Sequence, residues 1–223
     1  MESCTFVNVL MIEFKDFFIL SWNVRGFASK KSNQHMHEII MRYKPDLIFL
    51  YETRILFSKS KRFWDREGYI AVAVEEVNVH SGGIWALSNT STQVHFQPVH
   101  TMSQCITVKI SKGNSHWLCS GVYASPVNST RLSLWSHLID IRNSITSPWS
   151  LSGDFNEILT PLEQRGGNFC NARADKFASC LNNFDMIDME FFGSQYTWQR
   201  RCRNYQVVSR RLDRGVCDMR WRL

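Results

Sequence analysis

The stretch Trp149-Ser150-Leu151-Ser152-Gly153-Asp154-Phe155-Asn156 predicts a short strand that ends in a glycine, a carboxylate and an amide. Residues i and i+2 of an extended backbone face the same way, so Asp154 and Asn156 are expected to look into one site. Gly153 allows a close backbone approach or an unusual dihedral angle at the strand end. A carboxylate can activate water, and an amide can donate to an oxygen that gains charge in the transition state. The stretch therefore suits hydrolysis at phosphorus, and an ordinary Asp/Asn turn is the alternative.

Length and composition predict one domain in an intracellular protein. The chain has 223 residues, 44% of them hydrophobic, which suits a single sandwich or barrel-like domain. Its seven cysteines include no C-x-x-C pair, which favours reduced thiols and argues against structural zinc. Segment 1–20 has four charged residues scattered among apolar ones, so it fits neither a signal peptide nor a membrane span. We therefore expect a monomer in the nucleus or cytoplasm, without contact to a membrane.

The net charge of +6 is concentrated near the C-terminal end. Segment 200–222 has eight arginines against Asp213 and Asp218, and this difference accounts for the whole excess. Guanidinium groups bind phosphates through bidentate hydrogen bonds, whereas a solvated strand face is the alternative explanation for such a cluster. The arginines that we take as candidates for nucleic-acid contacts here are Arg200, Arg201, Arg210 and Arg211.

Strand-like segments alternate with helix-like ones, without an internal repeat or a long linker. The apolar run in 46–51 suits a strand that is covered on both faces. This order of elements predicts an α/β fold, a layered sandwich with sheets inside and helices outside. The other predicted strands are 17–24, 69–74, 83–87, 92–97, 104–110, 116–123 and 149–152; the predicted helices are 34–43, one from about 129 and one from about 172; and a hairpin is predicted with arms 196–203 and 205–214 that turns at Asn204.

Several polar groups follow strand ends in chain order. Each has a structural alternative: Asn23 could cap a turn, and Glu52 could pair with Arg54. Tyr123 could be a half-buried sheet tyrosine, and Asp213 could neutralise its arginine neighbours. Their joint order is harder to explain in this way. The complete set is Asn23, Glu52, Tyr123, Asp154, Asn156 and Asp213.

Together these residues resemble the endonuclease/exonuclease/phosphatase superfamily with the DNase I-like fold, and most closely the apurinic-type endonuclease domain of plant LINE retrotransposons. The resemblance spans about 17–214, so 1–16 is expected to be an extension and 17–223 the domain. It rests on 20–26 (LSWNVRG), 45–54 (PDLIFLYETR), 81–85 (SGGIW), 152–157 (SGDFNE), 163–167 (EQRGG), 194–198 (SQYTW) and 211–214 (RLDR).

The resemblance implies a four-layer α/β sandwich that cleaves a DNA phosphodiester with metal-assisted attack by water. Glu52, helped by Asn23, would match the position of Mg²⁺ or Mn²⁺. Asp154 would orient or activate the nucleophile. Asn156 would hold the scissile phosphate, and Tyr123 would donate to phosphate or to the leaving oxygen. Asp213 would orient a catalytic histidine.

Two departures from the family matter. Arg25 stands where the family often has an acid, which implies a changed contact to metal or phosphate and adds Arg25 to the candidates for nucleic-acid binding. The family's terminal Ser-Asp-His motif is absent, and none of the seven histidines occupies an equivalent position. We therefore expect a truncated domain that lacks its last strand or strands and is weakened or inactive. A non-catalytic nucleic-acid-binding remnant and a phosphatase of the superfamily are the alternatives.

Overall fold

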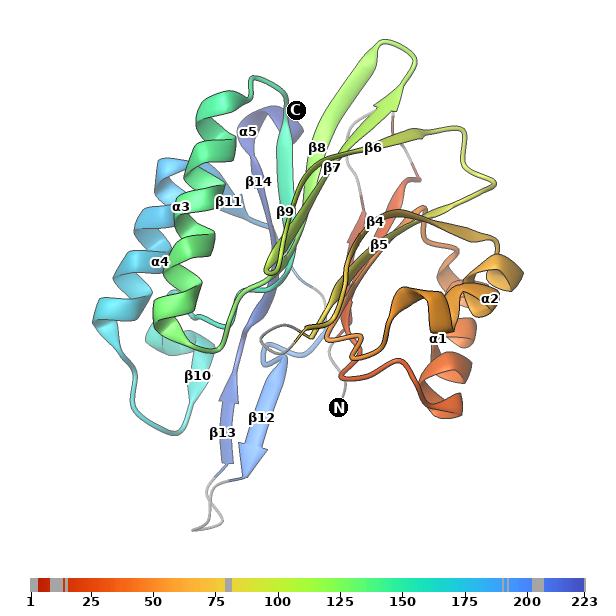
Figure 1. Cartoon of the computed structure of the whole chain (residues 1–223). Coiled ribbons are helices and arrows are strands. Elements are labelled where there is room, and N and C mark those ends of the chain that lie inside the picture. Colours follow the sequence, from red (N-terminus) through yellow and green to blue (C-terminus); the bar gives the residue numbers. More distant parts are fainter. Residues whose placement is uncertain are drawn as a thin grey trace.

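Figure 1 shows the computed structural model of the chain, which describes residues 4–8, 14, 16–78, 82–189, 191, 193–201 and 207–222. The strands are β1 (Cys4–Asn8), β2 (Phe18–Asn23), β3 (Leu47–Tyr51), β4 (Tyr69–Glu75), β5 (Ile84–Asn89), β6 (His95–Met102), β7 (Cys105–Lys112), β8 (Ser115–Tyr123), β9 (Trp149–Asp154), β10 (Gln164–Arg165), β11 (Met186–Asp188), β12 (Trp198–Arg201), β13 (Val207–Arg210) and β14 (Asp213–Asp218). The helices are α1 (Lys30–Tyr43), α2 (Phe57–Glu67), α3 (Asn128–Ser144), the 3-10 helix η2 (Pro161–Glu163), α4 (Asn171–Asn183) and α5 (Met219–Arg222).

Two large sheets form the inside of the molecule. The first has the strand order β1-β2-β3-β5-β4 and the second β11-β14-β9-β8-β7-β6. Each contains one parallel pair, β2 with β3 and β8 with β9, and a helix joins the two strands of each pair. Because parallel strands end at the same edge of a sheet, the residues that follow them are brought together there.

Alternation of side chains along the strands produces three apolar cores. On β3, Phe49 and Tyr51 face the second sheet, whereas Ile48 and Leu50 pack towards α1 and α2. On the other side of the molecule, α3 and α4 cover the second sheet. The layers are therefore helices, sheet, sheet and helices (Figure 1), and the predicted four-layer α/β sandwich is confirmed. The expectation that segment 46–51 is covered on both faces is also confirmed.

The C-terminal part of the predicted hairpin is wrong. β13 pairs with β12 in a small sheet with β10, but Asp213–Asp218 forms the separate strand β14, which pairs with β9 in the second sheet. Arg211 and Leu212 carry the chain from one sheet to the other. The predicted turn at Asn204 lies outside the described residues. Helix α2 is an element that the sequence did not predict.

The N-terminal segment, expected to be an extension, contributes to the first sheet. β1 pairs with β2 at its edge, and Phe14 is buried between the sheets. Among the helices that the structure describes, none is long and apolar enough to cross a membrane.

Candidate functional site

The two parallel strand pairs bring their carboxyl ends to one place. Asn23 ends β2 and Glu52 follows β3 in the first sheet, while Tyr123 ends β8 and Asp154 ends β9 in the second. Asn23 Nδ2 donates to Glu52 Oε1 at 3.1 Å and lies 3.5 Å from Asp154 Oδ2. The Tyr123 hydroxyl donates to Glu52 Oε1 at 2.6 Å. Side chains from both sheets thus share one hydrogen-bonded cluster, as the strand-end pattern predicted.

Glu52 is the centre of this cluster. Its Oε1 accepts from Tyr123 and Asn23, and its Oε2 is in contact with Arg54 Nη2. Burial alone would raise the pKa of Glu52, but the hydrogen bonds from Tyr123, Asn23 and Arg54 outweigh it, so the pKa is lowered. The carboxylate form is therefore favoured. The ion pair with Arg54, which the sequence left open as a structural alternative, exists within the site.

Asp154 has the opposite electrostatic environment. Burial and the nearby Asp213 carboxylate raise its pKa. Asp213 is the residue opposite Asp154 in the antiparallel pairing of β14 with β9. The backbone N–H groups of Leu212 and Asp213 both donate to Thr197 Oγ1 at 3.0 Å, which anchors this end of β14. Thr197 lies in the segment 194–198, but the sequence did not indicate this role.

Asn156 reaches the site through a turn. The expectation of an extended pair is wrong, because β9 ends at Asp154 and Asn156 has a positive φ of 48°. Asp154 Oδ1 accepts the Asn156 backbone N–H at 2.9 Å, which is the hydrogen bond of an Asx turn. Asn156 Nδ2 donates to the Ala124 carbonyl at 2.8 Å. The turn fixes both side chains next to the end of β8.

Unusual backbone conformation is concentrated around this site. Among the described residues, seven other than glycine have a positive φ. Four of them are site residues or lie two positions from one: Arg25, Glu52, Arg54 and Asn156. Such conformations are uncommon for residues with a side chain and persist where the surroundings impose them, often at functional sites.

A buried polar bridge joins the two sheets directly below the site. Ser21 Oγ on β2 and Ser152 Oγ on β9 are 2.7 Å apart, and the Tyr51 hydroxyl donates to the Ser152 carbonyl at 2.9 Å. Ser21 lies two residues before Asn23, and Ser152 lies two residues before Asp154. This bridge sets the spacing between the two halves of the site. The sequence gave no sign of it.

Gly153 allows the sheets to come this close. Its φ is +140°, and a Cβ atom there would lie 2.0 Å from the Val122 carbonyl oxygen and 2.8 Å from the Tyr51 hydroxyl. Both the close approach and the unusual dihedral angle expected from the sequence are therefore confirmed.

The chemistry of the donors fits a small, hard cation. Glu52 supplies a carboxylate, and Asn23 has an amide oxygen that accepts from the Arg25 backbone N–H at 3.3 Å. In the described part of the chain, no three His, Cys, Asp or Glu side chains form a ready-made metal cluster. Mg²⁺ usually binds through one or two carboxylates and completes its shell with waters and substrate phosphate. The Glu52 carboxylate fits this type of ligand set.

The candidate arginines divide into two groups. Arg200 and Arg201 are exposed on β12, in the arm that projects from the main body (Figure 1). Arg210 is half-buried on β13. Arg211 instead donates to Asp188 at 2.7 and 2.9 Å and to Glu163 at 3.2 Å. The buried Arg214 binds the same two acids. Arg211 is therefore largely neutralised within the fold, whereas Arg200 and Arg201 are available to a partner.

The described histidines have other surroundings. None of the six takes part in the hydrogen bonds of the strand-end cluster given above, and His80 lies outside the described residues. His35 packs on Trp22, His37 binds Glu67, His116 binds Ser147, His100 and His137 make an edge-to-face contact, and His95 is exposed on β6.

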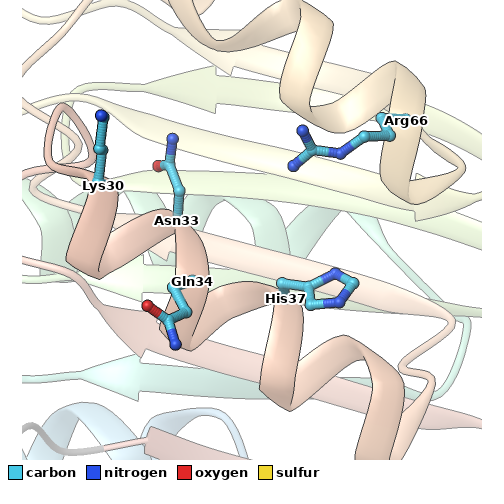
Figure 2. A pocket seen from close by; sticks show the side chains of 5 residues that line it. All are labelled: Lys30, Asn33, Gln34, His37 and Arg66. Atoms are coloured by element: carbon cyan, nitrogen blue, oxygen red, sulfur yellow. The ribbon is translucent and has the colours of Figure 1, made fainter.

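A hollow lies away from the strand ends, between α1 and α2. Figure 2 shows the Arg66 guanidinium reaching from α2 towards Asn33 on α1, with Lys30 at the start of that helix. Arg66 and His37 both bind the buried carboxylate of Glu67, at 3.0 and 2.7 Å. None of the five residues that line this hollow carries a carboxylate.

The fold is shared with solved structures of nucleases and phosphatases. No protein-family model matches the chain, and no curated protein does. The endonuclease domain of TRAS1, a telomere-specific non-LTR retrotransposon, is similar with a TM-score of 0.67 and 13% identity over 91% of this chain and 85% of that one. The AP endonuclease LMAP from Leishmania major is similar with a TM-score of 0.71 and 16% identity over 92% and 79%. The 3′ phosphatase NExo from Neisseria, bound to product DNA hairpin, has a TM-score of 0.65 and 16% identity over 90% and 86%. At these identities the likeness shows the DNase I-like fold.

Proposed function

We propose that this protein is a metal-dependent phosphodiester hydrolase that nicks DNA and that derives from a LINE-type retroelement. The observation that carries the proposal is the hydrogen-bonded cluster of Asn23, Glu52, Tyr123 and Asp154, which requires both sheets. A purely structural cluster would not need four strand ends from two sheets or the backbone strain around them. The retrotransposon endonuclease and the AP endonuclease that share the fold support the same substrate class.

The residues of the cluster suit distinct steps. Asp154 would accept a proton from the attacking water, and its raised pKa makes it a stronger base once it is ionised. Tyr123 stays protonated, because burial and the adjacent Glu52 raise its pKa, so it can donate to a phosphate oxygen or to the leaving oxygen. Asn156, held by its turn, would donate to the scissile phosphate.

Glu52 and Asn23 would hold the Mg²⁺ or Mn²⁺ ion. When bound, such an ion would neutralise charge on the phosphate and favour departure of the leaving oxygen. Arg200 and Arg201, on the projecting β12, would contact phosphates along the DNA. Arg25, whose backbone N–H donates to Asn23 Oδ1 at 3.3 Å, would add a contact close to the site.

We expect the activity to be weak. The proposed family relies on a histidine at the scissile phosphate, and none of the described histidines takes part in the hydrogen bonds of the strand-end cluster. Asp213 contributes, after burial, to the raised pKa of Asp154. Loss of one phosphate-contacting group typically reduces the rate by about 10²–10⁴-fold. We further propose a monomer that acts in the nucleus or cytoplasm.

The test is nicking of supercoiled plasmid by the purified protein in Mg²⁺. Asp154→Ala and Glu52→Ala should each reduce nicking by at least about 10²-fold. Asp65→Ala is the matched control, because Asp65 is an exposed aspartate of α2 that pairs only with Lys61 among the described side chains. Equal nicking by wild-type protein and both site variants would show a contaminating nuclease and overturn the proposal.

Hydrolysis of a phosphomonoester is a second candidate, supported by the 3′ phosphatase among the structures that share the fold. An oligonucleotide with a 3′-phosphate, supplied beside the plasmid, separates the two activities. Release of inorganic phosphate without nicking would favour the phosphatase.

A further inference from the structure

Arg54 is a cation that already occupies part of the proposed metal site. Its Nη2 is in contact with Glu52 Oε2, while Tyr123 and Asn23 take the other oxygen of the same carboxylate. All of the carboxylate's described hydrogen bonds therefore come from within the site. A metal ion that binds Glu52 must compete with this arrangement.

The backbone around Arg54 is held firmly. The Arg54 backbone N–H donates to the Gly82 carbonyl at 2.8 Å, and the Phe27 N–H donates to the Thr53 carbonyl at 2.9 Å. A Cβ atom at Gly82 would lie 2.9 Å from Glu52 Cα, so the two segments are in close contact. The positive φ of 57° at Arg54 is thus imposed by its neighbours.

The side chain of Arg54 has much more freedom than its backbone. It is 58% exposed, whereas that of Glu52 is 14% exposed. Glu52 is its only ion-pair partner among the described residues. The guanidinium end of this ion pair is open to solvent, which screens it and limits its contribution to stability. Among the described residues, movement of the guanidinium away from Glu52 breaks only this one ion pair.

We propose that Arg54 is an exchangeable counter-ion: it neutralises Glu52 in the metal-free protein, gives up this carboxylate when a divalent cation binds, and then binds a phosphate group of the nucleic acid. The proposal rests on the proposed function, because it needs the metal at Glu52. Guanidinium suits both partners, since it forms bidentate hydrogen bonds with carboxylate and with phosphate. Arg54 would thereby link metal binding to substrate binding.

The exchange has a direction that can be measured. Because the guanidinium and the metal compete for Glu52, removal of Arg54 should strengthen metal binding in the absence of DNA. Because the metal frees Arg54 for phosphate, the metal should strengthen DNA binding only while Arg54 is present. Both effects have one cause, the competition between Arg54 and the metal ion for Glu52, and linked binding equilibria of this kind are reciprocal.

The first experiment is calorimetric titration of Mg²⁺ into wild-type protein, Arg54→Gln and Arg66→Gln without DNA. Arg66 is the matched control, an exposed arginine that pairs with the buried Glu67 away from the strand ends (Figure 2). We expect Arg54→Gln to bind Mg²⁺ about five- to tenfold more tightly and Arg66→Gln to match wild type. Arg54→Lys, which keeps the charge, should stay close to wild type.

The second experiment measures binding of a fluorescent duplex in the Asp154→Ala background, which prevents cleavage. Mg²⁺ should increase the affinity severalfold when Arg54 is present and should have little effect when Arg54→Gln is added. Equal Mg²⁺ affinity of wild type and Arg54→Gln would overturn the exchange and leave the proposed function standing. Absence of Mg²⁺ binding to all of these proteins would overturn the metal site itself, and the exchange with it.

Discussion

Replacement of Gly153 by alanine tests the close packing of this residue against β8 in its own sheet and against Tyr51 of the first sheet. Gly153 lies between Ser152, which forms the buried bridge, and Asp154. Its φ of +140° is a conformation that residues with a side chain rarely adopt. An added Cβ would be 2.0 Å from the Val122 carbonyl oxygen, which belongs to the neighbouring strand β8. Alanine would therefore be both strained and obstructed.

The expected loss of stability follows from these two effects. A residue forced into a disallowed backbone region costs about 1–3 kcal/mol. The obstruction adds an overpacking cost of about 1–3 kcal/mol, because carbon and carbonyl oxygen normally approach only to about 3.3–3.6 Å and a strand backbone must move. The sum, about 2–6 kcal/mol, is a large part of the stability of a typical domain. For a chain of this size it corresponds to a decrease in melting temperature of at least about 4 °C.

Gly113→Ala is the matched control. Gly113 also has a positive φ, +58°, but a Cβ there would meet no atom within 4 Å. It should show only the conformational cost of about 1–2 kcal/mol. Urea unfolding followed by tryptophan fluorescence gives both free energies. The reasoning is refuted if Gly153→Ala loses no more stability than Gly113→Ala, because the contact with Val122 would then be without effect.

Three further predictions concern the bridge, the ion cluster and the projecting arm. Ser21→Ala and Ser152→Ala should each cost about 1–3 kcal/mol by removing one partner of the buried hydroxyl pair, and the double variant should cost less than their sum in urea unfolding. Burial alone would raise the pKa of Glu163, but Arg214 and its other partners lower it. Its contribution to stability is therefore complete above the unfolded pKa of about 4.3 and is lost as pH falls through the folded pKa. Glu163→Gln should be less stable than wild type by roughly 3 kcal/mol at pH 7, and the difference should disappear in acid unfolding. Arg200→Gln and Arg201→Gln should each reduce the slope of log affinity for DNA against log salt by about one, and unchanged slopes would exclude them from the interface.

The sequence was sufficient for the elements that depend on local patterns. The apolar run in 46–51 requires cover on both faces, and β3 has it. Gly153 was predicted to permit a close approach, and the contact with Val122 is that approach. The strand-end positions of Asn23 and Glu52 were also predictable, because a segment rich in β-forming residues ends directly next to each one.

The sequence was insufficient where distant segments decide the outcome. α2 was missed although its buried residues Ser60, Phe63 and Trp64 lie at helical spacing, as do the three buried residues of α1. The second arm of the predicted hairpin was extended to Arg214 because arginines and β-forming residues continue past Arg211. The chain instead leaves the hairpin there, because β14 pairs with β9. Which arginines remain free is likewise settled by acids elsewhere in the chain, such as Asp188.

The site follows from a repeated arrangement in the two sheets. Each sheet supplies one strand-helix-strand unit with parallel strands, and each unit ends in two polar residues of the cluster, Asn23 and Glu52 in one and Tyr123 and Asp154 in the other. Neither unit holds both the proposed metal position and the proposed base. The hydrogen bond from Tyr123 to Glu52 crosses between the sheets, as does the serine bridge beneath it. A change in the spacing between the sheets should therefore affect catalysis more than a change of similar energetic cost within one helical layer, because only the spacing alters the distance between Glu52 and Asp154.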